Sequence, residues 1–286
     1  MLKFATGSKR ASGILAGLLS TAAVLWPAAA AQNGATRIPN FAEDVSVGWL
    51  AAGTEFIAMP SGPHPVMPDP AHPYVQNGRG EQPTLRVADL DNPILQPWVK
   101  EALKKVNGRT LSGKDNFPPQ VRCWPLGVPA FVLYPAQPIF ILQTPKEVIM
   151  TWQADHMVRH IFLTDKHSAN VKPSWFGESI GHYENGDTLV VDTIGLNSRT
   201  FVDNYRTPHT DKLHVVEHFK LTNVDSRIEV TVTVEDPGAF TTPWSARQIY
   251  RRVEIGPMAE STCIEGNFNY FNFDLDPLPQ DDNPVF

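Results

Sequence analysis

Residues 178–194 read ESIGHYENGDTLVVDTI, a stretch that predicts a tight β-hairpin. Two runs rich in Val, Ile, Thr and Tyr flank Asn185-Gly186. Asn-Gly is favoured in two-residue hairpin turns, because both central positions take positive φ angles. Glycines within and beside the runs are typical of bends or bulges in a sheet. This stretch therefore predicts antiparallel strands in a curved sheet.

The same two-residue period continues over most of the chain after residue 137. The strand-like runs are QPIFILQTP, EVIMTWQA, HMVRHIFLT, ESIGHYE, DTLVVDTIG, KLHVVEHFKL, RIEVTVTVE and RQIYRRVEI. Short turn sequences separate most of these runs, as in an antiparallel meander. We expect a mainly β fold, either an antiparallel lipocalin-like barrel or a strongly curved sheet, because closure or curvature protects the sheet edges.

Two further segments precede these strands. Residues 32–95 are rich in proline, which stiffens the chain and cannot donate to a strand ladder, so we expect an extended N-terminal arm. Residues 93–110, PILQPWVKEALKKVNGRT, predict the one helix, with Pro97 in its first turn and an Asn-Gly pair near its end. Residues 96–286 are then a single domain made of the helix and the β-barrel.

The first 31 residues have the layout of a secretory signal peptide. Lys3, Lys9 and Arg10 give a basic start, the apolar run ILAGLLSTAAVLW follows, and small residues lead to a cleavage site near Ala31. The apolar run is too short to span a bilayer comfortably. We therefore expect a periplasmic or secreted protein with no membrane insertion after signal removal.

The charge balance bears on the class of partner. Lys plus Arg number 24 and Asp plus Glu number 30, so the formal net charge is −6 at pH 7. Loss of the basic signal would leave the mature chain more acidic still. An acidic chain without a basic run argues against nucleic acid as a partner. The partner that we expect is a small-molecule ligand.

The chain contains two cysteines, Cys123 and Cys263. In an oxidising compartment an even pair is most simply a disulfide, which would tie the segment before the barrel to its last strand. Two buried thiols are the alternative.

Seven of the nine histidines lie within residues 156–218, and three fall in PHTDKLHVVEHF, residues 208–219. His209, Asp211 and His214 cluster at the entry to a predicted strand, after a long loop of the kind that carries function at a barrel mouth. A neutral imidazole can take a proton, and a nearby carboxylate fixes its tautomer. We expect both histidines to carry protons and the aspartate to orient them. Loop-anchoring hydrogen bonds are the alternative.

The same three residues also allow a metal site. Zinc takes three or four N, O or S ligands, and His209, Asp211 and His214 offer three. They match no compact metal-family signature, so metal binding is kept as an alternative and no cofactor is assigned.

Further polar and aromatic residues are predicted to face the cavity. His156 is a fourth catalytic candidate, beside the turn between two strands. Arg159 suits a carboxylate or phosphate of a ligand. Asp192 interrupts an apolar strand and is either a structural partner, for instance of Arg159, or a catalytic acid. Trp175 and Tyr183 are predicted to line a hydrophobic pocket, although aromatic residues in strands are commonly core.

The strings PSWFGESIGHYENGDTLVVDTIG and DNYRTPHTDKLHVVEHF together resemble a widespread group of exported bacterial proteins. The shared features are a Trp-to-Gly strand entry, a GDTLVVDT strand and a PH-x-D-x-LHV-x-E segment. The resemblance covers roughly residues 120–265 and includes both cysteines. It implies export and one β-domain, and it transfers no catalytic residue because no activity is established for the group. His218 stands where the group's pattern has arginine, so no shared role is expected for it.

The leading hypothesis is an exported enzyme that uses His/Asp acid–base chemistry on a small, partly hydrophobic molecule in the barrel cavity. The reaction would be a lyase, isomerase or hydrolase step. The rival is a non-catalytic periplasmic ligand-binding protein of lipocalin-like shape. A third possibility is an interaction module at the cell envelope. Only the enzyme requires proton-transfer groups within reach of one ligand.

Overall fold

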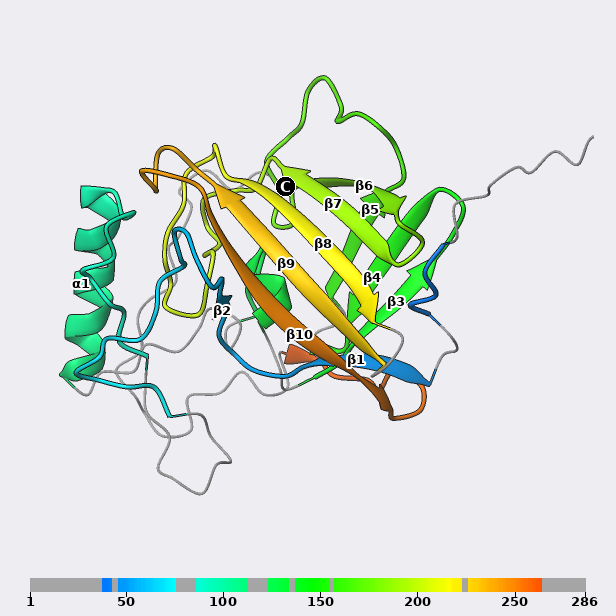
Figure 1. Ribbon diagram of the computed structural model, residues 1–286, viewed down its shortest axis with the longest axis horizontal. Helices are drawn as coiled ribbons and strands as arrows, with labels where there is room; N and C mark the ends of the chain where they lie inside the picture. The colour runs from blue at the N-terminus through cyan, green and yellow to red at the C-terminus, as the bar shows by residue number, and fades with distance from the viewer. Residues whose placement is uncertain are drawn as a thin grey trace, which may run out of the picture. The chain divides into compact units, whose positions relative to one another are not determined.

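Figure 1 shows the protein as a computed structural model. The structure describes residues 38–42, 46–75, 86–112, 123–133, 137–154, 157–222 and 226–263. The predicted signal peptide and the catalytic candidate His156 lie outside these ranges. Within the described ranges, no helix is both long and apolar enough to cross a membrane.

The strands form one sheet that closes into a nine-stranded barrel, so the predicted mainly β barrel is confirmed (Figure 1). The order around the barrel is β1-β3-β4-β5-β6-β7-β8-β9-β10, and β10 pairs with β1 to close it, while β2 pairs with β10 outside the ring. The strands are β1 Val47–Ala51, β2 Ile57–Ala58, β3 Ile139–Gln143, β4 Glu147–Trp152, β5 Met157–Phe162, β6 Glu178–Glu184, β7 Thr188–Ile194, β8 His214–Thr222, β9 Arg227–Glu235 and β10 Trp244–Glu254.

The predicted hairpin is the β6–β7 connection. Asn185 and Gly186 have φ angles of 52° and 73°, the left-handed values that a tight hairpin turn of the primed type requires. The Asp187 N–H donates to the Glu184 carbonyl at 3.3 Å across this turn. The register then runs from Glu184 opposite Thr188 to the far end of both strands, which fixes the face on which each side chain lies.

Alternation along the strands separates a buried core face from an outer face. On β8, Val215, Glu217 and Phe219 are buried, whereas His214 and His218 are only partly covered. The composition of the segment left both orientations open, and the tertiary structure selects the one that buries two large apolar side chains. The inward residues join one core that includes Trp49, Met150, Trp152, Ile161, Leu189, Val191, Val230, Val232, Trp244 and Tyr250.

One strand pairing departs from the predicted antiparallel meander. β5 and β6 are parallel, with Ile161 opposite Ser179 and Phe162 opposite Ile180. Parallel neighbours cannot be joined by a tight turn, because the chain must return to the starting end of the strand. Residues 163–177 make that return, and this crossover loop reaches the outer face near β7, where the candidate site lies.

The segment predicted as an N-terminal arm is in part a barrel element. β1 lies within residues 32–95 and pairs with β10 over five residues, from Val47 opposite Glu254 to Ala51 opposite Tyr250. Its sequence, VGWLA, is too short to show a period among the surrounding prolines and glycines. The arm therefore closes the barrel.

The predicted helix is α1, Pro97–Leu111, with Pro97 at its first position. It is the only α-helix among the described residues. Its buried face carries Val99 and Leu103. Trp98 lies on the more exposed side, and its indole N–H donates to the Gly238 carbonyl at 2.7 Å, which attaches the start of the helix to the connection between β9 and β10 (Figure 1).

The two cysteines form the predicted disulfide. Cys123 and Cys263 are 140 positions apart in sequence, and their Cα atoms are 5.5 Å apart. The bond joins the segment before η2, Ala130–Leu133, to the segment that follows β10. It therefore anchors the chain directly after the strand that closes the barrel.

Candidate acid–base site

The outer face of the barrel holds a carboxylate between two imidazoles. Asp192 points outward from β7, and the Nε2 atoms of His167 and His214 both lie 3.0 Å from its Oδ1 atom. His214 is the first residue of β8, and His167 lies in the crossover loop 163–177. An ionised carboxylate can only accept hydrogen bonds, so each imidazole donates its Nε2 hydrogen to Asp192.

The strand register brings Asp192 and His214 together. β7 and β8 are antiparallel, with Asp192 opposite Val216. His214 is two residues before Val216 and so lies on the same outer face. Diagonal neighbours on one face of adjacent strands are within reach of long side chains. Thr193 and Val215 alternate with the two outward residues and are buried in the core, which holds the orientation of both strands.

Two glutamates flank this group of three side chains. Glu178 Oε1 lies 3.0 Å from His167 Nδ1, and Glu235 Oε2 lies 3.7 Å from His214 Nδ1. Ser168 donates to Glu178 from its hydroxyl at 2.5 Å and from its backbone N–H at 2.7 Å. These hydrogen bonds from Ser168 hold the pKa of the Glu178 carboxyl below its ordinary value. Glu178 is therefore ionised at neutral pH.

His167 lies between two carboxylates. Both of its ring nitrogens lie 3.0 Å from a carboxylate oxygen, one from Glu178 and one from Asp192. The side chain is 18% exposed, so water competes weakly for these contacts. His167 therefore links the crossover loop to the barrel through these two contacts.

His214 differs from His167 in that only one of its ring nitrogens lies within hydrogen-bonding distance of a carboxylate. Its Nε2 is engaged by Asp192, whereas its Nδ1 is 3.7 Å from Glu235, beyond hydrogen-bonding distance. The side chain is 35% exposed. A partly exposed imidazole whose orientation is fixed by a carboxylate can accept and return a proton.

His209, predicted to share the site, lies in a separate buried position. Its Nδ1 donates to the Thr210 carbonyl at 2.8 Å, and its Nε2 accepts from the Thr200 hydroxyl at 2.8 Å. Burial lowers the pKa of His209, which keeps the ring neutral. Both nitrogens are occupied, so these contacts correspond to the loop-anchoring alternative. Asp211 is exposed in the turn before β8, and the carboxylate that orients His214 is Asp192 instead.

The predicted set of three metal donors is therefore not assembled. The ring nitrogens of His209 are turned to Thr200 and Thr210, away from any shared ligand position. Across the described ranges, no group of three or more His, Cys, Asp or Glu side chains has an arrangement suited to a metal ion.

Arg159 lies inside the barrel rather than at a ligand site. Its guanidinium contacts the Glu217 carboxylate, donates to Ser179 Oγ at 3.2 Å and donates to Thr193 Oγ1 at 3.0 Å. The side chains of Arg159 and Glu217 are both fully buried. The suggested pairing of Arg159 with Asp192 is wrong, because the two side chains point to opposite faces of the barrel wall.

The aromatic candidates make contacts with residues outside the group of His167, Asp192 and His214. Trp175 packs against Trp124, with ring centroids 5.3 Å apart. The hydroxyl of Tyr183 accepts a hydrogen bond from Gln143 Nε2 at 2.9 Å, and burial raises the pKa of Tyr183. The structure thus brings together two of the predicted site residues, His214 and Asp192.

Sequence reasoning missed three members of the site, namely His167, Glu178 and Glu235. The hairpin register carried a signal for Glu178, because counting outward from the turn places it on the same face as Asp192. No local signal places His167, which reaches the site only through the crossover loop. No family model matches the chain, and no curated protein matches it.

Proposed function

We propose that the protein is an exported acid–base enzyme whose proton carrier is His214. The observation that carries the proposal is the contact of His214 Nε2 with Asp192 Oδ1 at 3.0 Å, while Nδ1 lies 3.7 Å from Glu235 Oε2, beyond hydrogen-bonding distance. The candidate reactions are the lyase, isomerase and hydrolase steps in which a proton leaves one atom of a small molecule and another atom is protonated.

In the proposed step, His214 Nδ1 takes a proton from the substrate while Nε2 keeps its own hydrogen. The ring becomes an imidazolium, and the Asp192 carboxylate stabilises that new charge. The proton then returns from Nδ1 to the leaving atom or to the adjacent carbon. His167 has a positioning role, because it is held by Glu178 through Nδ1 and contacts the Asp192 carboxylate through Nε2.

An exported location is part of the proposal. Disulfides persist in oxidising compartments such as the periplasm and the extracellular space, and the Cys123–Cys263 disulfide supports such a location. The signal-like residues 1–31 support it independently.

The test is a turnover screen with matched variants. Purified mature protein is incubated with panels of esters, lactones, hydroxy acids and β-hydroxy carbonyl compounds, and products are followed by mass spectrometry. The variant His214→Ala should lower turnover by about 100-fold or more, the usual contribution of a general base.

The matched control is His182→Ala on the outer face of β6. His182 also contacts a carboxylate, Glu184, at 2.9 Å, but it lies outside the candidate site. This variant should keep wild-type turnover. Equal turnover by wild type and His214→Ala, with both folded by circular dichroism, would overturn the proposal.

A further inference from the structure

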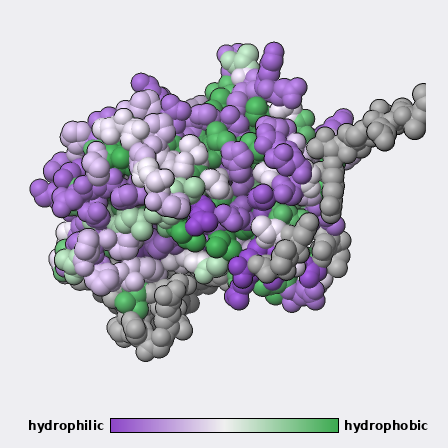
Figure 2. Space-filling view, in the orientation of Figure 1, coloured by the Kyte–Doolittle hydropathy of each residue, from purple (hydrophilic) through white to green (hydrophobic). Residues whose placement is uncertain are grey.

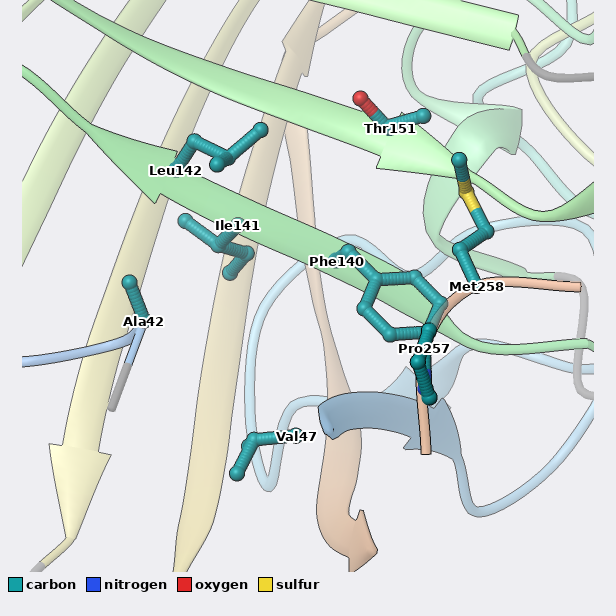
Figure 3. Close-up of a pocket in the computed structure, with 8 residues that line it drawn as sticks. All are labelled: Ala42, Val47, Phe140, Ile141, Leu142, Thr151, Pro257 and Met258. Atoms are coloured by element: carbon teal, nitrogen blue, oxygen red, sulfur yellow. The ribbon is translucent and has the colours of Figure 1, made fainter. Parts of the chain in front are cut away.

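The barrel is joined at the seam between β1 and β3 by a single residue pair. β1 pairs with β10 over five residues, yet it pairs with β3 only at Trp49 opposite Ile139. If the antiparallel ladder continued, Val47 would lie opposite Ile141. These two residues instead help to line a pocket at the seam (Figure 3).

The pocket has a volume of about 270 Å³ and apolar walls. Of the eight described residues that line it, Thr151 is the one polar side chain; the others are Ala42, Val47, Phe140, Ile141, Leu142, Pro257 and Met258. In Figure 3, Phe140 and Met258 lie next to each other, and the Met258 side chain points towards Thr151. Leu142 is 50% exposed, so part of this apolar wall is open to water.

The segment after β10 supplies one wall of the pocket, and several contacts hold it in place. The Ala259 N–H donates to Gln153 Oε1 at 3.2 Å, and Gln137 Nε2 donates to Ser261 Oγ at 3.3 Å. The segment ends at Cys263, which is bonded to Cys123. Pro257 and Met258 are therefore held over the seam from both ends, by β10 on one side and by the disulfide on the other.

We propose that this seam pocket binds a small, uncharged, mainly apolar molecule, such as a fused two-ring aromatic compound with at most one hydroxyl group. The volume lies just below the range of roughly 300–1,000 Å³ that holds drug-sized ligands, which limits the occupant to a smaller molecule. None of the eight described lining residues offers a charged side chain to an ionic group, and burying an unpaired charge is costly. The hydroxyl of Thr151 can form a hydrogen bond with a single polar group of the ligand. The thioether of Met258 adapts to irregular apolar shapes.

This site is separate from the acid–base site. None of the eight pocket residues contacts His214 or Asp192 in the interactions described above, and the two sites are formed by different strands. Binding in the pocket should therefore survive His214→Ala, so failure of one proposal leaves the other untouched.

The test uses 2-naphthol as a neutral fluorescent probe and 2-naphthalenesulfonate as its charged analogue. The protein should bind 2-naphthol saturably, one molecule per chain, and bind the sulfonate about tenfold or more weakly. Leu142→Glu places a charge at the pocket and should weaken 2-naphthol binding by about tenfold or more. Met258→Trp fills the space and should have the same effect.

The matched control is Phe162→Glu. Phe162 is 46% exposed on β5 and does not line the pocket, so this variant should bind 2-naphthol as the wild type does. Reduction of the disulfide should weaken binding, because it releases the segment that carries Met258. Binding that Leu142→Glu and Met258→Trp leave unchanged would overturn the proposal. A dimer in sedimentation that Leu142→Glu dissociates, without probe binding to wild type, would overturn it too, since a second copy would then cover the seam.

Discussion

Asp192 and His214 lie on neighbouring strands of the barrel, with Asp192 Oδ1 3.0 Å from His214 Nε2. The same oxygen accepts a hydrogen bond from His167 Nε2 at 3.0 Å, so one carboxylate oxygen orients two imidazoles. Both nitrogens of His167 lie 3.0 Å from a carboxylate oxygen, whereas Nδ1 of His214 lies 3.7 Å from the nearest one described, Glu235 Oε2. This difference is the basis of the proposed roles, an anchor for His167 and a proton carrier for His214. The group lies on the outer face of β7 and β8. The face of the molecule seen in Figure 1 is coloured by hydropathy in Figure 2, and it carries hydrophilic residues with smaller groups of hydrophobic ones between them.

Replacing the orienting carboxylate should release His214. Asp192→Asn keeps the shape of the side chain but loses its charge and offers an N–H₂ group as well as an oxygen. We expect His214 to change from the tautomer with hydrogen on Nε2 to a mixture, and turnover in the screened reaction to fall by about 100-fold or more. Long-range ¹H–¹⁵N spectra report the tautomer. Glu184→Gln at the exposed His182 contact is the control and should leave His214 unchanged; an unaltered His214 tautomer in Asp192→Asn would contradict the assignment.

Removing the anchoring imidazole should loosen the crossover loop 163–177. His167→Gln loses at least one of two charge-assisted hydrogen bonds, to Glu178 and Asp192. Local opening should become easier, and exchange of the Ser168 amide hydrogen, which donates to Glu178, should accelerate by about tenfold. Hydrogen exchange with mass spectrometry measures this effect, and His182→Gln serves as the control. Unchanged exchange at Ser168 would show that the loop is held by other contacts.

The buried carboxyl of Asp203 should make stability depend on pH. Burial raises the pKa of Asp203 from 3.8 to about 6, although Thr207 and Tyr205 donate hydrogen bonds to it. A raised pKa means that the folded state binds the proton more tightly than the unfolded state. The stabilisation is therefore full below about pH 4 and is lost as pH rises through 6, by on the order of 3 kcal/mol.

The measurement for Asp203 is urea unfolding of wild type and Asp203→Asn between pH 4 and 7. The free energy of unfolding of wild type, relative to that of the variant, should fall as pH rises over this range and then level off. The comparison cancels other titrating groups common to both proteins. A difference independent of pH would mean that the Asp203 carboxyl titrates alike in the folded and unfolded states.

Removing only one partner of the Arg159–Glu217 ion pair inside the barrel should strongly destabilise the protein. Arg159→Met leaves the Glu217 carboxylate buried without its cation and should lower the free energy of unfolding by about 3–5 kcal/mol. The double variant Arg159→Met/Glu217→Leu should recover much of that loss, because no charge stays buried, and because Ser179 and Thr193 keep their mutual hydrogen bond at 2.9 Å. Chemical denaturation measures both variants. Arg247→Met is the control, since its partly exposed contact with Glu229 should contribute about 0–1 kcal/mol.

The elements of the fold that could be predicted are those with local signals. The Asn185-Gly186 turn, the alternating strands, the first turn of α1 at Pro97 and the disulfide each depend on residue type or compartment. β1 could not be found in this way, because five residues among prolines and glycines show no period. The parallel pairing of β5 with β6 was also missed, since alternation within a strand carries no information about the direction of its neighbour.

The candidate site was predicted in part for the same reason. His214 and Asp192 were each singled out, but Asp211 was expected to orient His214 because it lies three positions away in the chain. The register of β7 and β8 overrides that proximity, since it places Asp192, 22 positions away, against the ring. His209 was grouped with His214 by sequence, whereas the fold buries its ring between Thr200 and Thr210.

Taken alone, the amino-acid sequence determined most local conformations: where the strands after residue 137 run, where the helix begins, and which turns are tight. These follow from backbone preferences and from the two-residue alternation of side chains. Only the tertiary structure decided which face of β8 is buried, how β1 closes the barrel, and which carboxylate meets His214. Those outcomes depend on contacts between segments far apart in the chain. The free energy of these contacts comes from burying the apolar faces of several strands together, so it cannot be read from any one segment.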